Sequence, residues 1–277
     1  IEISSGEFNI NKWFDTKSLV LDKKELLDNI SFEELKGIYS EKILETVSMA
    51  CNSDVGYGVC LSGGIDSAIL AYTMSGITKN FTSYTASYER FKDKEKNLAK
   101  DFASHIGIHH KSTFLENKDI FTLLSRMICQ QQEPIGGLQT IAYYKMHEFA
   151  KKDGVKVLLE GQGIDEILGG YPYYERIVNG EFTDTKNIHI DGTYINTNDF
   201  LTDEYQNSFN KNRKVKYKFS NLIDYQIYDI EFRKIPRVLR MNDLLSMHSS
   251  IELRVPFLDP ELMIFCLALK DNFKIFN

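Results

Sequence analysis

The sequence predicts an α/β protein in which helices flank a parallel sheet and additional helices follow at the C-terminal end. Three observations support this prediction. Short apolar runs alternate with helix-length segments between residues 31 and 169, which indicates βαβ units. The first apolar run, 55–61, leads straight into a glycine-rich turn, and the run 155–159 is bracketed by Gly154 and Gly161. In such sheets, ligands bind at the carboxyl ends of the strands.

The elements follow in order from the N-terminus. Residues 1–20 are polar and weakly patterned, so we expect the tail of something upstream rather than the start of a fold. Ser31, followed by Glu33 and Glu34, predicts a capped helix that runs to about Ala50. The strands that we expect are 55–61, 81–87, 110–114 and 155–159. The helices that we expect between them are 66–74, 93–105, 118–130 and 138–152.

The C-terminal part is patterned differently. Residues 169–220 lose periodicity and are rich in Tyr, Asn, Asp, Thr and Gly, which predicts a long insertion or mobile surface segment that orders over a substrate. Residues 221–253 are expected to be mostly helical, and 260–269 to form one more short helix. Within 252–257, Glu252 and Arg254 are expected to form a buried structural pair, because charges usually enter a core in pairs.

Composition excludes several classes of function. A hydrophobic share of 43% and a charged share of 26% in 277 residues are typical of a globular protein. The net charge of −6 argues against a nucleic-acid-binding surface. Because the sequence has neither an apolar segment of bilayer length nor a signal-peptide pattern, we predict a cytoplasmic protein without membrane contact.

Cysteine and histidine spacing predicts no metal site. The four cysteines form no CxxC pair and have no histidine at ligand spacing, so we expect reduced thiols. The six histidines likewise show no metal-binding pattern, and a structural or solvated role is expected for each.

The turn at 62–67 reads Ser-Gly-Gly-Ile-Asp-Ser. Gly63 and Gly64 let the backbone approach a phosphate closely, and the helix start after Ile65 directs N–H groups at that anion. Ser62 and Ser67 add hydroxyl donors, and Asp66 can hold a magnesium ion. No Lys follows the glycines, which excludes a Walker loop. The alternative is an ordinary turn, in which Ser and Gly are common.

A second glycine-bearing loop leaves the strand 155–159 and carries Gly161, Gln162, Asp165 and Glu166. Both loops follow strand ends, so they are expected to meet at the same edge of the sheet. Asp165 could instead cap the short segment that it opens.

Five blocks in order resemble a known family: 61–67, 84–110, Glu133-Pro134, 159–171 and 240–259. The last ends in Glu-Leu-Arg-Val-Pro-Phe-Leu-Asp and, with the Gly-Gln-Gly-Ile-Asp-Glu block, is the most specific. Together they resemble the synthetase domain of the glutamine-hydrolysing, class B asparagine synthetase family. The resemblance implies an adenine nucleotide α-hydrolase-like fold of the ATP pyrophosphatase type. It also implies ATP and Mg²⁺ as cofactors, and a ligase that adenylates a carboxylate and transfers ammonia to it.

The resemblance also implies roles for individual residues. Asp66 and Asp165 are expected to hold magnesium between the phosphates. The residues expected to take part in catalysis are Gln162, Asp165 and Glu166. The residues expected to bind ATP, at its pyrophosphate end or around adenosine, are Leu61, Ser62, Gly63, Gly64, Ile65, Asp66, Ser67, Ala86 and Gly161.

Three departures from the family pattern leave the substrate open. Gln162 stands where many asparagine synthetases carry an acidic residue, and a glutamine cannot act as a base. The loop 133–138 offers no cation for an α-carboxylate, unless Arg237 or Arg240 reaches in. The chain is expected to be cut at both ends. Residues 1–30 would be the remnant of an upstream glutaminase domain, and residues 31–277 would be a synthetase domain truncated at its C-terminus.

The family resemblance makes aspartate the default acceptor. The alternatives are another carboxylate, such as a uronic acid of a polysaccharide, and a catalytically inactive nucleotide-binding paralogue. A tRNA-modifying pyrophosphatase is disfavoured by the acidic balance. Homodimer formation is left open.

Overall fold

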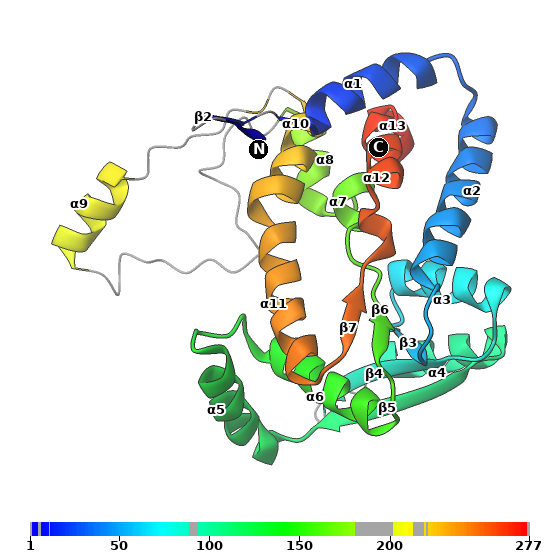
Figure 1. The fold of residues 1–277 in the computed structure, drawn as a ribbon, viewed down its shortest axis with the longest axis vertical. Helices are drawn as coiled ribbons and strands as arrows, with labels where there is room; N and C mark the ends of the chain where they lie inside the picture. The colour runs from blue at the N-terminus through cyan, green and yellow to red at the C-terminus, as the bar shows by residue number, and fades with distance from the viewer. Residues whose placement is uncertain are drawn as a thin grey trace.

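Five parallel strands form the central sheet, in the order β5-β4-β3-β6-β7 (Figure 1). The structure is a computed structural model that describes residues 2–4, 7–10, 12–88, 94–180, 202–212, 219 and 221–275. The strands are β3 (Tyr57–Cys60), β4 (Thr82–Tyr88), β5 (His109–Leu115), β6 (Val157–Leu159) and β7 (Glu252–Arg254). Each neighbouring pair is parallel. The predicted fold class is confirmed.

Helices occupy most of the remaining described chain. They are α1 (Thr16–Leu27), α2 (Phe32–Ala50), α3 (Ile65–Ile77), α4 (Lys94–Ile106), α5 (Ile120–Gln131), α6 (Leu138–Lys152), α7 (Ile164–Leu168), α8 (Pro172–Val178), α9 (Asp203–Asn212), α10 (Leu222–Tyr228), α11 (Ile235–His248), α12 (Pro260–Ala268) and α13 (Asp271–Lys274). A π-helical turn, Asp229–Arg233, joins α10 to α11. The predicted start of α2 is confirmed by a capping box, in which Ser31 and Glu34 bond each other's backbone N–H groups.

Alternate residues of the sheet enter two different apolar layers. Val59 and Leu159 belong to the main core with side chains of α2, α3 and α12. Cys60, Tyr84 and Leu158 point to the opposite face, where Met146 and Ala150 of α6 pack against them. This alternation follows from the two-residue period of strands. It explains why β3 and β6, which are buried on both faces, read as continuous apolar runs.

The N-terminal segment differs from the prediction. Residues 16–27 form α1, which lies beside α12 (Figure 1) and buries Val20 and Leu27 in the main core. Asp15 caps this helix through its side chain. Ahead of it, β1 (Glu2–Ser4) and β2 (Glu7–Asn9) form an antiparallel pair. The weak pattern arises because α1 buries only a narrow stripe. The origin of residues 1–30 in an upstream domain stays a prediction.

Two further segments correct the sequence analysis. The mostly helical segment expected at 221–253 is confirmed by α10 and α11, but its last residues belong to β7, because pairing with β6 places Glu252–Arg254 at the edge of the sheet. The expected loop after residue 169 begins instead with α8, whose Tyr174 is fully buried. Further along the segment lies α9, and residues 181–201, 213–218 and 220 lie outside the described residues.

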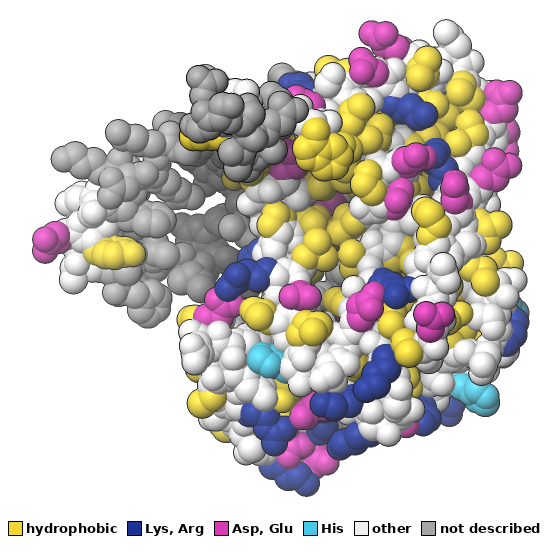
Figure 2. All heavy atoms as spheres, in the orientation of Figure 1, with side chains coloured by type: hydrophobic (Ala, Val, Ile, Leu, Met, Phe, Trp, Pro, Cys, Tyr) yellow, Lys and Arg dark blue, Asp and Glu magenta, His cyan; other side chains and the backbone are white. Residues whose placement is uncertain are grey.

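The surface is mixed. Figure 2 shows hydrophobic side chains over α1 and α2, where Leu26 and Leu44 are among the exposed ones. Among the described residues, no helix is both long enough and apolar enough to cross a membrane.

Candidate active site

The loop between β3 and α3 is held open by its own serines. The backbone N–H of Ser62 donates to Ser67 Oγ at 3.1 Å, and the two hydroxyl oxygens lie 3.0 Å apart. Gly64 N–H donates to Ser62 Oγ, and Gly63 takes a φ of 83°, a region that favours glycine. Gly64 is the N-cap of α3 and supplies no side chain to its first turn. The N-terminal N–H groups of this 13-residue helix therefore remain available to an anion.

The loop after β6 packs directly against the first loop. A Cβ atom at Gly161 would lie 3.1 Å from the Ser67 nitrogen and 3.1 Å from the Asp66 carbonyl carbon. Gly163 has a φ of 108°, and a Cβ there would overlap Leu258. Glycine at 161 allows the close approach of the two loops, and glycine at 163 leaves room for Leu258, so the predicted meeting of the two loops is found in the structure.

A cavity of about 360 Å³ opens where the loops meet. Of the predicted site residues, its wall includes Leu61, Ser62, Asp66, Ser67, Ala86, Gly161, Gln162 and Asp165. Gly63, Gly64 and Ile65 belong to the loop but not to the wall. Glu166 also does not line the cavity. The remaining lining residues are Cys60, Tyr84, Thr85, Tyr88, Gln139, Ala142, Tyr143, Met146 and Glu160.

The charge at this wall is negative. Burial, then the charge of Asp165 and then that of Glu166, raises the pKa of Asp66 from its ordinary 3.8 to about 6. No Lys or Arg lines the cavity among the described residues. Asp165 does not cap α7, whose N-cap is Gly163. Two carboxylates at one wall are the donor set that a hard divalent cation such as Mg²⁺ prefers, so the residues fit this ion.

The Asparagine synthase family matches residues 39–277. The chain belongs to this family. Asparagine synthetase [glutamine-hydrolyzing] 1 of Bacillus subtilis is 25% identical, over 86% of this chain and 44% of the relative. Asparagine synthetase B of Escherichia coli is 27% identical, over 61% of this chain and 31% of the relative. A putative asparagine synthetase 2 of Methanocaldococcus jannaschii is 30% identical, over 54% of this chain and 32% of the relative. The chain spans less than half the length of these relatives.

Solved structures give a weaker likeness. An NMN synthetase from Francisella tularensis shows 16% identity and a TM-score of 0.34, over 49% of this chain and 58% of the other. An NH3-dependent NAD synthetase from Campylobacter jejuni shows 16% identity and a TM-score of 0.32, over 86% of this chain and 95% of the other. Scores this low carry no argument about the site.

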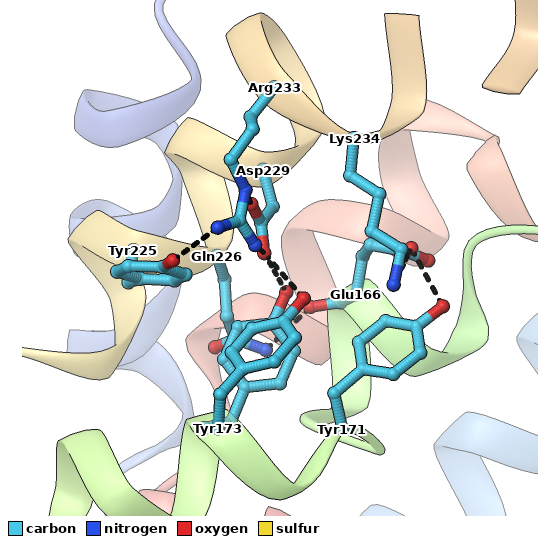
Figure 3. A network of polar contacts seen from close by, with 9 residues as sticks. Glu166, Tyr171, Tyr173, Tyr225, Gln226, Asp229, Arg233 and Lys234 are labelled. Atoms are coloured by element: carbon cyan, nitrogen blue, oxygen red, sulfur yellow. Dashed lines mark hydrogen bonds and ion pairs between the residues drawn. The ribbon is translucent and has the colours of Figure 1, made fainter. Parts of the chain in front are cut away.

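Glu166 lies in a polar network beside the cavity (Figure 3). It is 2% exposed, accepts a hydrogen bond from the Tyr171 hydroxyl at 3.0 Å, and lies 3.9 Å from Lys234 Nζ. Its backbone carbonyl accepts from Gln226 Nε2 at 2.7 Å. Within the family fold, Glu166 therefore joins α7 to the helices from residue 222 onward. Glu166 does not line the cavity, and the part in catalysis expected of it from the sequence stays a prediction.

Several lining residues were not found by sequence reasoning. Glu160 is the most notable, because it is 2% exposed and burial raises its pKa to about 7. The sequence feature that could have marked Glu160 as a site residue is its position directly after a strand, one residue before Gly161. Gln139 and Tyr143 come from α6, and no local motif marks them.

The two arginine expectations have different outcomes. Arg240 does not reach the cavity and instead pairs with Glu133 at 2.9 Å on the surface. Arg254 does pair with Glu252, at 2.7 Å, but the pair is not buried, since the Glu252 side chain is 60% exposed. The Arg254 guanidinium also donates to the carbonyls of Ala50 and Asn52. It thereby ties β7 to the end of α2.

We expect Asp66→Asn to stabilise the magnesium-free protein above pH 6. A raised pKa means that the folded state holds the proton more tightly than the unfolded chain. Ionised Asp66 therefore lowers the stability progressively from pH 3.8 to about 6. After a discount for solvent screening, the variant should gain about 1 kcal/mol above that range, and nothing below it.

The measurement is urea unfolding in chelator at several pH values. Asp101→Asn, on the exposed surface of α4, is the control and should follow the wild type. Equal stability of wild type and Asp66→Asn at pH 8 would contradict the expectation.

Proposed function

We propose that this chain is the synthetase domain of an ATP-dependent amide-forming ligase. The domain would adenylate a carboxylate, release pyrophosphate, and then let ammonia displace AMP. Membership of the asparagine synthase family supports an amidotransferase of this kind. One observation carries the proposal further: the two glycine-bearing loops bring Asp66, Asp165 and the start of α3 to a single cavity.

Different residues at the wall of the cavity would bind the pyrophosphate end of ATP, the adenosine and the magnesium ion. The first-turn N–H groups of α3 and the hydroxyls of Ser62 and Ser67 would bind the pyrophosphate end of ATP. Leu61, Ala86 and Gly161 would frame the adenosine. Asp66 and Asp165 would hold Mg²⁺, which neutralises the charge that develops on the leaving pyrophosphate. Preorganisation by the serine hydrogen bonds keeps the loop ready for the anion.

The nitrogen step has no general base in the predicted position. Gln162 lines the cavity, but its amide can only orient the acyl group or the amine by hydrogen bonding. Ammonia would thus arrive neutral. In the relatives, whose names specify glutamine hydrolysis, an upstream glutaminase domain would supply it. The 277-residue chain alone should accept free ammonium and leave glutamine unhydrolysed.

The acceptor follows from the charge at the wall. An amino-acid substrate such as aspartate carries a second carboxylate, and burying that carboxylate without a cationic partner is costly. Among the described residues the wall has Asp66, Glu160 and Asp165 but no cation. We therefore expect a carboxylate without an α-carboxyl group, such as a uronic acid, to be preferred over aspartate.

The experiment is a pyrophosphate-release assay on the full-length protein with ATP, Mg²⁺ and ammonium. Aspartate, several uronic acids and other carboxylates are compared, and Asp66→Asn serves as the control without turnover. Selective turnover of aspartate would overturn the acceptor proposal while keeping the ligase. ATP binding without pyrophosphate release with any acid would favour an inactive nucleotide-binding paralogue, and absence of both would overturn the ATP-dependent ligase itself.

A further inference from the structure

Cys60, His147 and Glu160 meet at the floor of the cavity although they are far apart in sequence. Cys60 ends β3, Glu160 follows β6, and His147 lies on α6. Their ligand atoms all lie within 4.8 Å of one another. We propose that these three side chains bind one divalent transition-metal ion of the zinc class. This proposal does not rest on the proposed function.

The histidine is the strongest indication. His147 is fully buried, and neither ring nitrogen has a hydrogen-bond partner among the residues that the structure describes. Burial lowers the pKa of His147 to about 4, so the imidazole is neutral at physiological pH. One of its two ring nitrogens then carries a free lone pair. A buried polar atom without a partner is costly, and a metal ion bound at the unprotonated ring nitrogen supplies the partner that this nitrogen lacks.

The distances fit a tetrahedral zinc site. Cys60 Sγ lies 3.5 Å from Glu160 Oε1, and His147 Nε2 lies 3.9 Å from the same oxygen. Zinc bonds of about 2.3 Å to sulfur and about 2.0 Å to oxygen place those two atoms about 3.5 Å apart at the tetrahedral angle. The imidazole needs only a small side-chain movement to complete the arrangement.

The strand register explains why the cluster exists. Val59 pairs with Leu159 in the parallel ladder, so Cys60 and Glu160 come next to each other and point to the face that α6 covers. Asn242 of α11 donates to Glu160 Oε2 at 2.8 Å. This bond fixes the carboxylate and leaves Oε1 directed at the thiol and the imidazole, as the outer hydrogen-bond partners of metal ligands do.

Charge balance also favours a metal. Burial raises the pKa of Cys60 well above its usual range, and that of Glu160 to about 7. A divalent ion bound by thiolate, carboxylate and neutral imidazole has no net charge, so the site can stay buried. Binding would release the thiol proton and any proton on Glu160 to solvent.

The fourth metal position would face the cavity, because Cys60 and Glu160 line it and His147 does not. Three protein ligands with one open position are the pattern of zinc sites that bind water or a substrate atom. The thiolate separates this site from the all-oxygen pair Asp66 and Asp165, since soft ligands select zinc over magnesium.

The test loads the chelator-stripped 277-residue chain with Co²⁺ as a spectroscopic substitute for Zn²⁺. We expect one thiolate-bound Co²⁺ per chain, seen as a sulfur-to-cobalt charge-transfer band. Cys60→Ala should abolish the band. His147→Ala should weaken metal binding at least about 100-fold. Even mutation of a residue that only hydrogen-bonds to a metal ligand lowers metal affinity about 10- to 100-fold. Cys129→Ser, which alters an exposed cysteine, and Asp165→Asn should both retain the band.

Absence of the band in the wild type would overturn the proposal, and so would a band that survives Cys60→Ala. If Cys60→Ala does not fold, X-ray absorption on the zinc-loaded wild type decides. One sulfur at about 2.3 Å with nitrogen and oxygen at about 2.0 Å supports the site, and an all-oxygen shell refutes it.

Discussion

Replacing Asp165 by asparagine is expected to lower the rate of pyrophosphate release by the full-length protein at least about 100-fold. Asp165 lines the cavity opposite the start of α3, where the proposed Mg²⁺ would be held. A catalytic metal ion stabilises the transition state by several kcal/mol, so loss of a ligand carboxylate is expected to remove most of the rate. The change is nearly isosteric, and Asp165 makes no capping bond that the fold requires.

The rate is measured with saturating ATP over a range of Mg²⁺ concentrations, beside circular dichroism to confirm folding. Asp101→Asn is the matched control on the surface of α4 and should keep the wild-type rate. Wild-type turnover by folded Asp165→Asn would show that the metal role assigned to this carboxylate is wrong.

The second large effect concerns stability. We expect Asp229→Ala to lower the free energy of unfolding by about 3–5 kcal/mol, the usual cost of leaving one charge of a buried pair unpaired. Asp229 is fully buried, forms an ion pair with Arg233, and accepts hydrogen bonds from the hydroxyls of Tyr173 and Tyr174 at 2.8 Å each (Figure 3). Its removal leaves both hydroxyls without their acceptor and leaves the guanidinium without a carboxylate, with the Tyr225 hydroxyl as its remaining hydrogen-bond partner.

Urea unfolding monitored by circular dichroism gives this difference. The contrast is Glu33→Ala, which removes an exposed pair with Lys36 on α2 and should cost at most about 1 kcal/mol. The double variant Asp229→Leu/Arg233→Met should recover much of the loss, because apolar replacement of both partners removes the stranded charge. Equal effects of Asp229→Ala and Glu33→Ala would contradict the assigned role of the network.

The local sequence was sufficient for most of the sheet and for the two loops. The apolar runs of β3 and β6 are continuous because both faces are buried, and the glycines mark the turns that follow them. Side chains within one such loop are neighbours in sequence, so the loop from Leu61 to Ser67 could be located from its motif, and its role in binding ATP stays a prediction. The family match then extends over residues 39–277.

The short and marginal elements could not be predicted in this way. β7 has three residues, and its strand state depends on hydrogen bonds to β6, which lies far upstream in the chain. The helix α1 depends on α12, against which it packs. For such segments, tertiary contacts outweigh the local pattern.

By itself, the sequence determined the parallel α/β class, the glycine-rich loop after β3 and the loop that carries Asp165, because each depends on residues close together in the chain. Only the tertiary structure decided that Glu166 lies outside the cavity wall, in a tyrosine-rich network. It alone also joined Cys60, His147 and Glu160, which have no ligand spacing in the sequence. The physical reason is the parallel register, which places the ends of β3 and β6 side by side under α6 whatever their separation along the chain.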